Sequence, residues 1–435
     1  MEVLAYPTPA AERRIQEIVS RRLSYPEAVE REVAEIIHAV QREGDAALVR
    51  YTRTYDAAEF TRAQIQVSQA ELAEARDRVA REFLDVIERA GRNITRFHEA
   101  QRRQSWFLPG ADGSLLGQVV QPVAAAGLYI PGGRRGETPL VSSLLMNAIP
   151  AQVAGVSRVQ VVTPPRTDGS VNPHLLAAAE FLGIRDVFKA GSAWAIAALA
   201  SGTETIPAVD VIVGPGNIYV TLAKKLVAGQ VGIDMVAGPS EILVIADSSA
   251  DPRHVAADLL SQAEHDAMAS AVLLTTDSEV ARATCVTLTA QAARLPRRQI
   301  AEEALTHFGA VIVVPDLETA LALANRIAPE HLELLVAQPF ELLGKVRNAG
   351  AVFLGHHSPE AVGDYFAGPN HVLPTAGTAR FSSALSVDHF IKKTSVIAYS
   401  EKAFQRDARD IMRLAEIEGL EAHANSVRIR LERRD

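Results

Sequence analysis

The chain has 435 residues, of which 48 % are hydrophobic and 22 % charged, as in an average soluble globular protein, which argues against long disordered or coiled-coil stretches. Its formal charge of −8, without a dense Lys/Arg block, argues against nucleic acid as a partner. The single cysteine, Cys285, excludes an intrachain disulfide and a multi-thiolate metal site. No apolar run approaches the roughly 18 residues that cross a bilayer. We therefore expect a cytoplasmic protein with no membrane contact.

The first 122 residues predict a helical section, because residues 11–106 are rich in Glu, Arg and Ala and place apolar residues at helical spacing, as at Val29, Val33 and Ile36. From Val123 onward, short β-prone runs alternate with stretches that can form helices. The expected strands are VAAAGLYI, RVQVVTP, RDVFKAG and VDVIVG. This alternation predicts a first Rossmann-like α/β unit over residues 123–238.

The same alternation then starts again. The expected strands of the second series are EILVIAD, AVLLTTD, AVIVVPD, LELLVA and AVFLG, which predict a second Rossmann-like unit over residues 239–380. The N-terminal section, residues 1–122, is expected to pack on this second unit, and residues 381–435 are expected to form a helical tail. The predicted fold class is α/β, with two tandem Rossmann-like units between a helical N-terminal section and a helical C-terminal tail.

A first candidate metal pair lies in the second unit. Asp251 and Pro252 are typical of an N-cap followed by the first helical residue, and the helix that they open carries Gln262 and His265 one turn apart. Two such side chains project from one face and can hold a metal ion. The alternative is an ordinary solvated helix face.

Glu330 and His331 follow Ala328 and Pro329 at an expected helix-to-strand junction. Histidine has an unperturbed pKa of about 6.5 and can accept a proton near neutral pH, and an adjacent glutamate can be tuned for similar work. From the dipeptide alone, a helix-end carboxylate beside a hydrogen-bonded polar histidine is the preferred interpretation.

Two further features lie toward the C-terminus. Asp364, in the sequence GDYFAGPNHVLP, could complete a metal shell or form an Asx-turn. Glu418 and His423 are five residues apart, so they would lie about 140° apart on a straight helix and could not share a face. Either Gly419 breaks the helix or the two side chains act on different partners.

Glycine turns suggest a phosphate site. The sequence VIVGPGN, residues 211–217, runs from an expected strand into an expected helix, whose first N–H groups could meet a phosphate. GLYIPGG and AGPSE are also strand-associated turns. Each of these turns could equally be a tight structural connection.

Taken together, these segments resemble the histidinol dehydrogenase family, which oxidises L-histidinol through L-histidinaldehyde to L-histidine with NAD and zinc in histidine biosynthesis. The matching blocks lie in order between about Tyr129 and His423. They are GLYIPGG, LLMNAIPAQVAGV, GTETIPAVDVIVGPGNIYV, IDMVAGPSEILVIAD, LLSQAEHD, APEHLEL, GDYFAGPNHVLPTAGTARFSSALSV and AEIEGLEAH.

The resemblance implies a homodimer with a shared active site and one Zn²⁺ per subunit. It assigns the metal ligands to Gln262, His265, Asp364 and His423, the last of them from the partner chain. It assigns the substrate contacts to Ser240, Gln262, His265, His331, Asp364, Glu418 and His423. It also implies that His331 accepts the alcohol proton and that Glu330 activates the water that hydrates the aldehyde.

For NAD, the resemblance points to Tyr129 and Asn217, and it places Trp194 at a third contact. The family commonly has Gly-Gly-Ala-Gln where this chain has residues 191–194, Gly-Ser-Ala-Trp. An indole can stack on a ring or ribose but cannot replace the amide's paired donor and acceptor, and Trp194 could equally be packed core. The turn RRGET, residues 134–138, is longer than the common family turn, and its two arginines could pair with phosphate.

Other functions remain open on these residues. A related enzyme could keep the zinc and the Glu-His pair but oxidise another small polar alcohol, such as a sulfonated diol, although Glu418 and His423 favour histidinol. A zinc hydrolase in which Glu330 activates water, and a small-molecule binding protein of two α/β lobes, are the alternatives from other classes.

Overall fold

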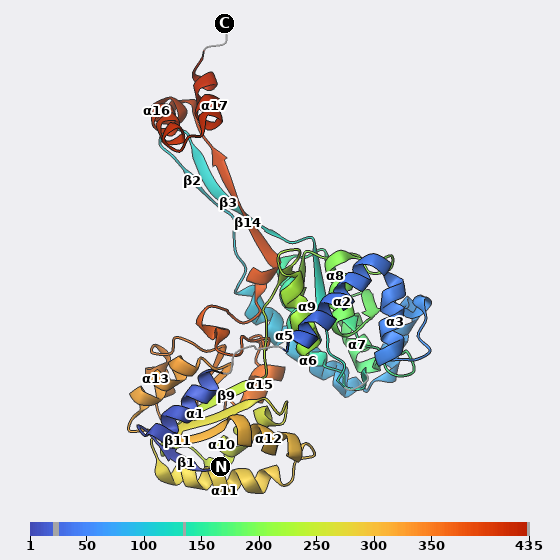
Figure 1. Ribbon diagram of the computed structural model, residues 1–435, viewed down its shortest axis with the longest axis vertical. Helices are drawn as coiled ribbons and strands as arrows, with labels where there is room; N and C mark the ends of the chain where they lie inside the picture. Colours follow the sequence, from blue (N-terminus) through green and yellow to red (C-terminus); the bar gives the residue numbers. More distant parts are fainter. Residues whose placement is uncertain (21–25, 134–135, 433–435) are drawn as a thin grey trace. The chain divides into compact units, whose positions relative to one another are not determined.

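The computed structural model describes residues 1–20, 26–133 and 136–432 (Figure 1). The chain divides into two compact units. The first unit comprises Met1–Gln101 and Val123–Phe390, and the second comprises Arg102–Pro122 and Ile391–Asp435. The first unit contains two parallel sheets with their helices, and the second contains a three-stranded antiparallel sheet and two helices. The observed fold is thus mixed α/β.

The first sheet has the order β6-β5-β4-β7-β8, and all its strands are parallel. The strands are β4 (Ala125–Tyr129), β5 (Arg158–Thr163), β6 (Asp186–Lys189), β7 (Val211–Val213) and β8 (Gly232–Ile233). The helices between them are α6 (Val141–Ala154), α7 (Pro173–Phe181), α8 (Ser192–Ser201) and α9 (Ile218–Val227). Helix α8 is buried on every side, which explains why apolar residues occur around its whole circumference. The sequence predicted every strand of this sheet except the two-residue β8.

The second sheet has the order β1-β11-β10-β9-β12-β13 and is also parallel throughout. Its strands are β1 (Val3–Ala5), β9 (Glu241–Ala246), β10 (Ser270–Thr275), β11 (Gly309–Val313), β12 (His331–Leu335) and β13 (Ala351–Leu354). Its helices are α10 (Pro252–Ala263), α11 (Ser278–Ala292), α12 (Arg298–Phe308), α13 (Leu317–Ile327), α14 (Pro339–Leu343) and α15 (Glu360–Tyr365). Strands β9, β10 and β12 are buried along their whole length, which explains their nearly continuous apolar sequences.

The N-terminal helices divide between the two sheets, which corrects the expectation that they pack on the second. Strand β1 and α1 (Pro9–Val19) join the second sheet and its core. By contrast, α2 (Glu27–Glu43) and α3 (Asp45–Tyr55) pack on α8 and α9, and α5 (Arg81–Glu99) packs on α6. The short α4 (Gln69–Ala75) contacts α7. The apolar stripe of α2 that includes Val33 and Ile36 is therefore buried against the first sheet's helices.

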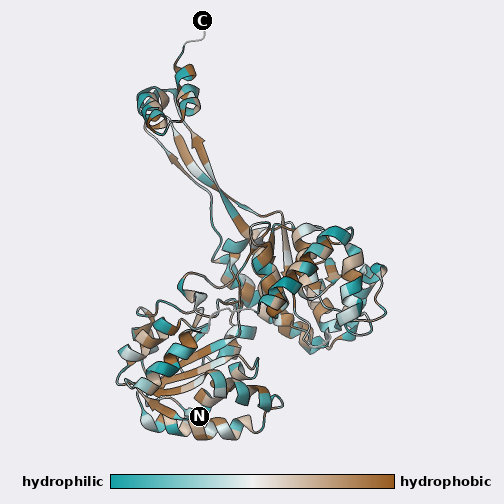
Figure 2. Ribbon diagram, viewed as in Figure 1, coloured by the Kyte–Doolittle hydropathy of each residue, from teal (hydrophilic) through white to brown (hydrophobic). Residues whose placement is uncertain are grey.

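The second unit differs from the expected helical segments. Its sheet pairs β2 (Trp106–Pro109) and β14 (Ile391–Ala398) antiparallel on either side of β3 (Leu115–Pro122), and α16 (Glu401–Ile417) and α17 (Glu421–Leu431) follow. The strands fall within segments for which helices were expected. Apolar residues recur along these strands and on α16 (Figure 2), and many remain exposed, among them Leu108 at 62 %, Ile397 at 75 % and Ile417 at 69 %.

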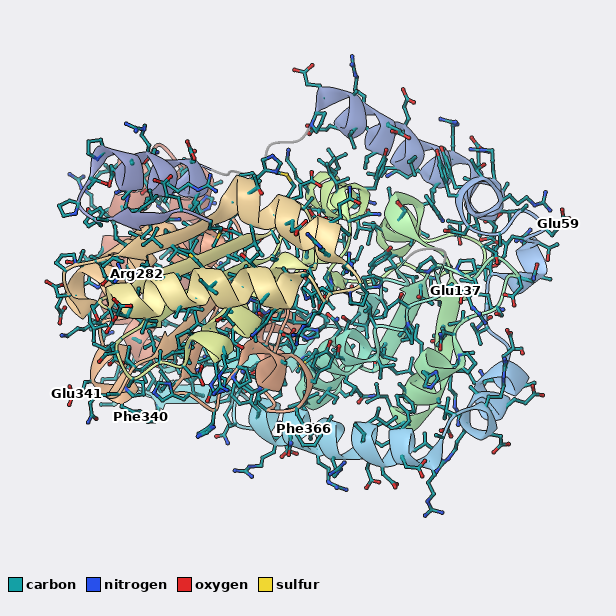
Figure 3. The ribbon with its side chains drawn as sticks, turned by 90° about the horizontal axis from the view of Figure 1, so that it is seen from below. Glu59, Glu137, Arg282, Phe340, Glu341 and Phe366 are labelled. Carbon is teal, nitrogen blue, oxygen red and sulfur yellow. The ribbon has the colours of Figure 1, made fainter. Side chains whose placement is uncertain are left out.

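Charged side chains lie at the surface of the first unit. Figure 3 shows Glu59, Glu137 and Arg282 at the surface of the first unit, and all three are exposed. Across the described ranges, no helix combines the length and apolar character needed to cross a membrane.

Candidate active site

His331 is held in a single orientation. Helix α13 ends at Ala328, whose left-handed backbone (φ 56°) turns the chain through Pro329 into β12, which begins at His331. The Nδ1 atom lies 3.0 Å from the carbonyl oxygen of Glu241, so Nδ1 carries the ring proton and Nε2 keeps its lone pair. The side chain is buried, and Nε2 has no hydrogen-bond partner among the described residues. A buried, available lone pair is what a general base requires.

Two carboxylates of α15 face this nitrogen. Nε2 of His331 lies 3.9 Å from Oε1 of Glu360 and 4.0 Å from Oδ1 of Asp364. Burial, followed by repulsion from Asp364, raises the pKa of Glu360 to about 8, and burial raises the pKa of Asp364 to about 6. Burial, with smaller contributions from His371 and His265, lowers the pKa of His331 to about 4, although the hydrogen bond to the Glu241 carbonyl opposes the shift. Near neutral pH the imidazole is therefore neutral and Asp364 is ionised.

Gln262 reaches the same carboxylates from the last turn of α10. With its amide nitrogen turned toward Glu360, it donates to the two carboxylate oxygens at 2.8 and 3.0 Å. As predicted, α10 opens on the Asp251 cap, but it ends at Ala263. His265 therefore lies beyond the helix and is exposed, so the expectation that it shares a helix face with Gln262 is wrong.

The donor set fits a divalent cation. One atom each of His331, Glu360 and Asp364 lie within 4.8 Å of one another. Nitrogen and oxygen donors of this kind bind zinc, and the C-terminal end of α10, beside Gln262, adds negative potential. Repulsion from Asp364 adds to the raised pKa of Glu360, and a bound Zn²⁺ would relieve that repulsion.

Of the four ligands that the resemblance implies, the structure brings Gln262 and Asp364 to the surroundings of His331, with His265 within electrostatic reach. His423 belongs to the second unit, as does Glu418, and both side chains are exposed. Gly419 has a left-handed backbone (φ 73°) between α16 and α17. Of the two alternatives for this segment, the one in which Gly419 breaks the helix is confirmed.

Glu330 lies beside the base. Its Oε2 atom accepts a hydrogen bond from the Glu241 backbone N–H at 2.9 Å, and Ser240 immediately precedes that residue. Burial raises the pKa of Glu330 well above its usual range, and nearby acidic groups add to the shift. His331 is the first residue of β12 and pairs with Ile242, the second residue of β9. Glu330 and His331 therefore lie at the amino ends of these two strands. Parallel α/β sheets more often place their ligands at the carboxyl ends.

Sequence reasoning missed several members of this cluster. The Glu360 backbone N–H donates to Oε1 of Glu333, which is fully buried behind His331. Burial and repulsion by Asp258 raise the pKa of Glu333 well above its usual range. Two signals were present in the sequence: Glu333 lies two residues after His331 in a strand, and Glu360 lies one helical turn before Asp364.

The residues expected to contact NAD lie on the first sheet, where a pocket of about 250 Å³ opens at the start of α8 and α9. We call it the α8–α9 pocket. It is lined by Glu32, Ile36, Tyr55, Asp56, Ser192, Trp194, Asn217 and Tyr219. Tyr129, at the end of β4, accepts a hydrogen bond from the Ser192 backbone N–H at 3.1 Å. The pocket thus lies at the carboxyl ends of strands, where nucleotides bind in such sheets.

Trp194 borders this pocket and is also packed core. It is only 4 % exposed, and its ring stacks on Tyr51 and Tyr55 at centroid distances of 5.7 and 5.6 Å. Its Nε1 atom is buried without a hydrogen-bond partner among the described residues. Arg134 and Arg135, which were expected to pair with phosphate, lie outside the described residues.

The GPGN turn is fixed from both sides. The Gly214 N–H donates to Asp234 at 2.8 Å, and its carbonyl accepts from Lys224 at 2.9 Å. Gly214 has φ 118°, and a Cβ atom there would lie 2.2 Å from the Tyr129 carbonyl oxygen, so only glycine fits. Asn217 caps α9 by accepting from the next N–H groups of that helix. The turn is therefore rigid where it meets the pocket.

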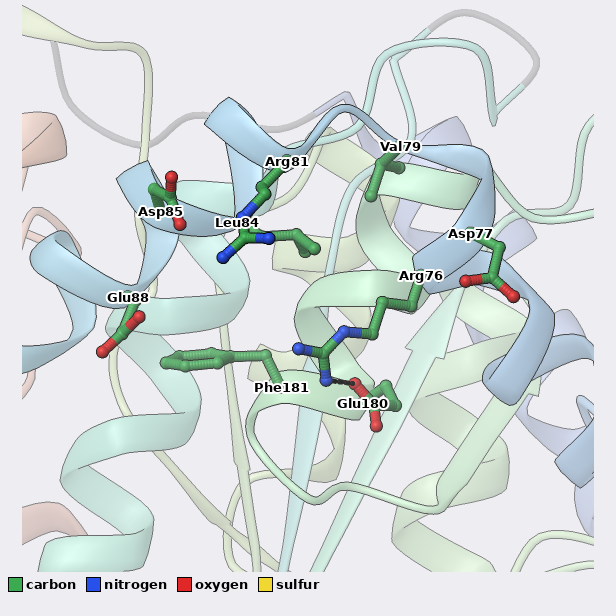
Figure 4. A pocket seen from close by; sticks show the side chains of 9 residues that line it. All are labelled: Arg76, Asp77, Val79, Arg81, Leu84, Asp85, Glu88, Glu180 and Phe181. Carbon is green, nitrogen blue, oxygen red and sulfur yellow. Dashed lines mark ion pairs between the residues drawn. The ribbon is translucent and has the colours of Figure 1, made fainter.

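A second pocket, of about 490 Å³, lies between α5, α7 and the turn after α4 (Figure 4). Its charged side chains pair with one another, as in the contact of 3.8 Å between Arg76 and Glu180. None of its described lining residues has a buried polar atom without a partner, so it is a weaker candidate for a ligand site.

Comparisons with known proteins point to one family. The sequence profile of the family described as histidinol dehydrogenase matches residues 19–431. Histidinol dehydrogenase from Nitratidesulfovibrio vulgaris is 56 % identical over 94 % of this chain and 94 % of its own. That from Heliobacterium mobile is 51 % identical over 100 % of both chains. The crystal structure of histidinol dehydrogenase from Elizabethkingia anophelis is similar with a TM-score of 0.92, 39 % identity, and coverage of 99 % of this chain and 98 % of that one.

Proposed function

The chain belongs to the histidinol dehydrogenase family, and we propose that it oxidises L-histidinol through L-histidinaldehyde to L-histidine with NAD⁺ and one Zn²⁺ per subunit. One observation carries the mechanism: the buried Nε2 atom of His331 has no hydrogen-bond partner in the part of the chain that the structure describes, and it faces Asp364 at 4.0 Å. Base, acidic groups and candidate metal donors all lie at one end of the second sheet.

His331 performs the proton transfers. Its Nε2 accepts the alcohol proton in the first oxidation, and the ionised Asp364 stabilises the imidazolium that forms, which offsets the low pKa of the buried ring. Glu330 takes a proton from the water that adds to the aldehyde. His331 then accepts the hydroxyl proton of the hydrate in the second oxidation. The Glu241 carbonyl keeps the ring in the required orientation throughout.

NAD⁺ and Zn²⁺ would supply complementary chemistry. When bound, NAD⁺ accepts a hydride in each oxidation, and Zn²⁺ orients the imidazole and amine of the substrate. Gln262, His265 and Asp364 would hold the metal from one chain. The α8–α9 pocket, which Asn217 lines, and the neighbouring Tyr129 would hold part of the dinucleotide. Both parallel sheets have the chain order 3-2-1-4-5, with β1 added to the second, which supports the proposal that both are Rossmann-like units.

We propose that the second unit mediates a homodimer. Exposed apolar side chains on a small unit mark an interaction surface, and Leu108, Ile397 and Leu414 are each more than 60 % exposed. His423 would then complete the metal site of the partner chain, and Glu418 would contact its substrate. Both are exposed in the isolated chain, as this role requires.

The test is a direct assay. The zinc-loaded protein is mixed with limiting L-histidinol and excess NAD⁺, and NADH absorbance is followed to completion. Two NADH per histidinol support the proposal. No turnover of histidinol, with turnover of another small polar alcohol, would identify a related dehydrogenase. No NAD⁺-linked turnover of any such alcohol would favour a hydrolase or a binding protein.

A further inference from the structure

The α8–α9 pocket is too small for a whole dinucleotide. Drug-sized ligands occupy about 300–1,000 Å³, so a volume of about 250 Å³ suits a single nucleoside. All of its lining residues come from the first sheet's helices and from α2 and α3, and none belongs to the cluster around His331. The hydride must be delivered near His331. The pocket therefore suits the half of the dinucleotide that does not react.

The first parallel sheet lacks the acidic residue that usually follows the second strand of a dinucleotide site. In such units a carboxylate about 20 residues past the first glycine turn binds the ribose hydroxyls, at the end of the second strand. Here the second strand, β5, ends at Thr163 and is followed by Pro164 and Pro165. No acidic side chain stands at that position in the sequence.

Asp56 supplies a carboxylate at the same place from a different element. A Cβ atom built on Gly191 would lie 2.9 Å from Cβ of Pro164 and 3.4 Å from Oδ2 of Asp56. The Asp56 carboxylate thus lies beside the end of β5, across Gly191. It reaches this place because α3, which ends at Tyr55, packs against α8.

The setting of Asp56 is unfavourable unless a ligand binds. Asp56 is the C-cap of α3, where the helix dipole disfavours negative charge. Its Oδ2 atom is buried without a hydrogen-bond partner among the described residues, and burial raises the pKa of this carboxyl to about 7. An unsatisfied buried acceptor destabilises a fold, and sugar hydroxyls would satisfy it.

The other lining residues suit a nucleoside. Tyr55 is 56 % exposed and stacks on the buried Trp194, so its free face can support a base. The described lining has two carboxylates, Asp56 and Glu32, and no lysine or arginine. A phosphate group placed against these carboxylates would be repelled.

We infer that the α8–α9 pocket binds the adenosine half of NAD⁺ and that Asp56 accepts hydrogen bonds from the ribose hydroxyls, thereby selecting NAD⁺ over a dinucleotide with a 2′-phosphate. The inference rests on the proposed NAD-dependent activity. It assigns the role of the missing β5 carboxylate to a residue of the N-terminal helices. In this arrangement Trp194 supports Tyr55 by stacking on it, whereas the glutamine common in the family at this position would contact the cofactor through its amide.

The test compares wild type with Asp56→Asn and Asp56→Ser. The matched control is Asp77→Asn, an exposed carboxylate that lines the other pocket (Figure 4). Binding of ADP-ribose and of 2′-phospho-ADP-ribose is measured by calorimetry, and KM and kcat are measured with NAD⁺ and NADP⁺. We expect both Asp56 variants to bind ADP-ribose about 10-fold more weakly and to lose about 10-fold of the preference over the 2′-phosphate form, with KM for histidinol unchanged.

The outcomes separate the two claims. If wild type oxidises histidinol with NAD⁺ but the Asp56 variants keep its dinucleotide preference and its ADP-ribose affinity, the inference is overturned and the proposed function stands. If histidinol is not oxidised but ADP-ribose binding depends on Asp56, the function is wrong and the pocket assignment stands. A loss of preference in Asp77→Asn equal to that in Asp56→Asn would also overturn the assignment to Asp56.

Discussion

The carbonyl oxygen of Glu241 accepts a hydrogen bond from Nδ1 of His331 at 3.0 Å, and the same residue's N–H donates to Glu330 at 2.9 Å. One peptide segment at the start of β9 therefore orients both proposed catalytic side chains. The lone pair on Nε2 of His331 is available to a reacting group because Nδ1 carries the ring proton.

Two substitutions test the role of His331 in proton transfer. His331→Asn retains a donor for the Glu241 carbonyl, whereas His331→Ala removes both donor and base. We expect both variants to lower kcat by about 10²-fold or more while zinc content, measured by mass spectrometry, is retained. Near-normal turnover would refute the role of base. Loss of zinc in both variants would identify His331 as a ligand.

Glu330→Gln should affect the two oxidations unequally. The substituted amide still accepts from the Glu241 N–H but cannot take a proton from water. We expect turnover of added L-histidinaldehyde to fall by about 10²-fold, and oxidation of L-histidinol to the aldehyde to fall by less than about 10-fold. Rapid-quench analysis of both substrates measures this. An equal loss in both steps would contradict a role limited to hydration.

Glu360→Gln should weaken metal binding, although Glu360 is not among the ligands that the resemblance assigns. Glu360 accepts from the Gln262 amide nitrogen through both oxygens, which turns the amide oxygen of Gln262 away from Glu360. Loss of such an outer partner typically lowers metal affinity by about 10- to 100-fold. Competition with a zinc chelator measures the affinity, and the exposed Glu303→Gln is the control. Unchanged affinity would show that Gln262 needs no such support.

Mixed dimers test the shared site. We expect His423→Ala and Asp364→Ala each to lose zinc and activity as separate proteins. Mixing them under exchange conditions should restore part of the activity, since in a mixed dimer one of the two sites combines the intact ligands of both chains. Verified mixed dimers that stay inactive would contradict the contribution of His423 across the interface.

The buried carboxyl of Asp56 should make stability depend on pH. Burial raises the pKa of this carboxyl from 3.8 to about 7 in the folded chain, because it disfavours the charged form. The protonated carboxyl therefore contributes fully to stability below pH 3.8, and this contribution is lost as pH rises through 7. Asp56→Asn should therefore be more stable than wild type, by about 2 kcal/mol at pH 8.5 after allowance for partial exposure, and by less at pH 5.5. Urea unfolding at both pH values measures this, and Asp77→Asn should show no such gain.

The sequence alone determined most of the local structure. Strands such as β9 and β10 are apolar runs buried on both faces, and helices such as α10 begin at an aspartate followed by proline, so periodicity and capping identified them. The Glu330-His331 pair and Asp364 were also proposed as site residues from their blocks of sequence, and their roles remain predictions. The strands β2, β3 and β14 were missed because an exposed antiparallel sheet has no continuous apolar run.

Only the tertiary structure decided which distant groups meet. Glu360 meets His331 and Glu333 because β12 lies beside β13 and α15 follows them, and Asp56 reaches the end of β5 because α3 packs on α8. These contacts link residues dozens to more than a hundred positions apart. Local propensity is set by neighbours within a few residues, whereas such contacts depend on how whole apolar faces are buried together, which local patterns do not specify.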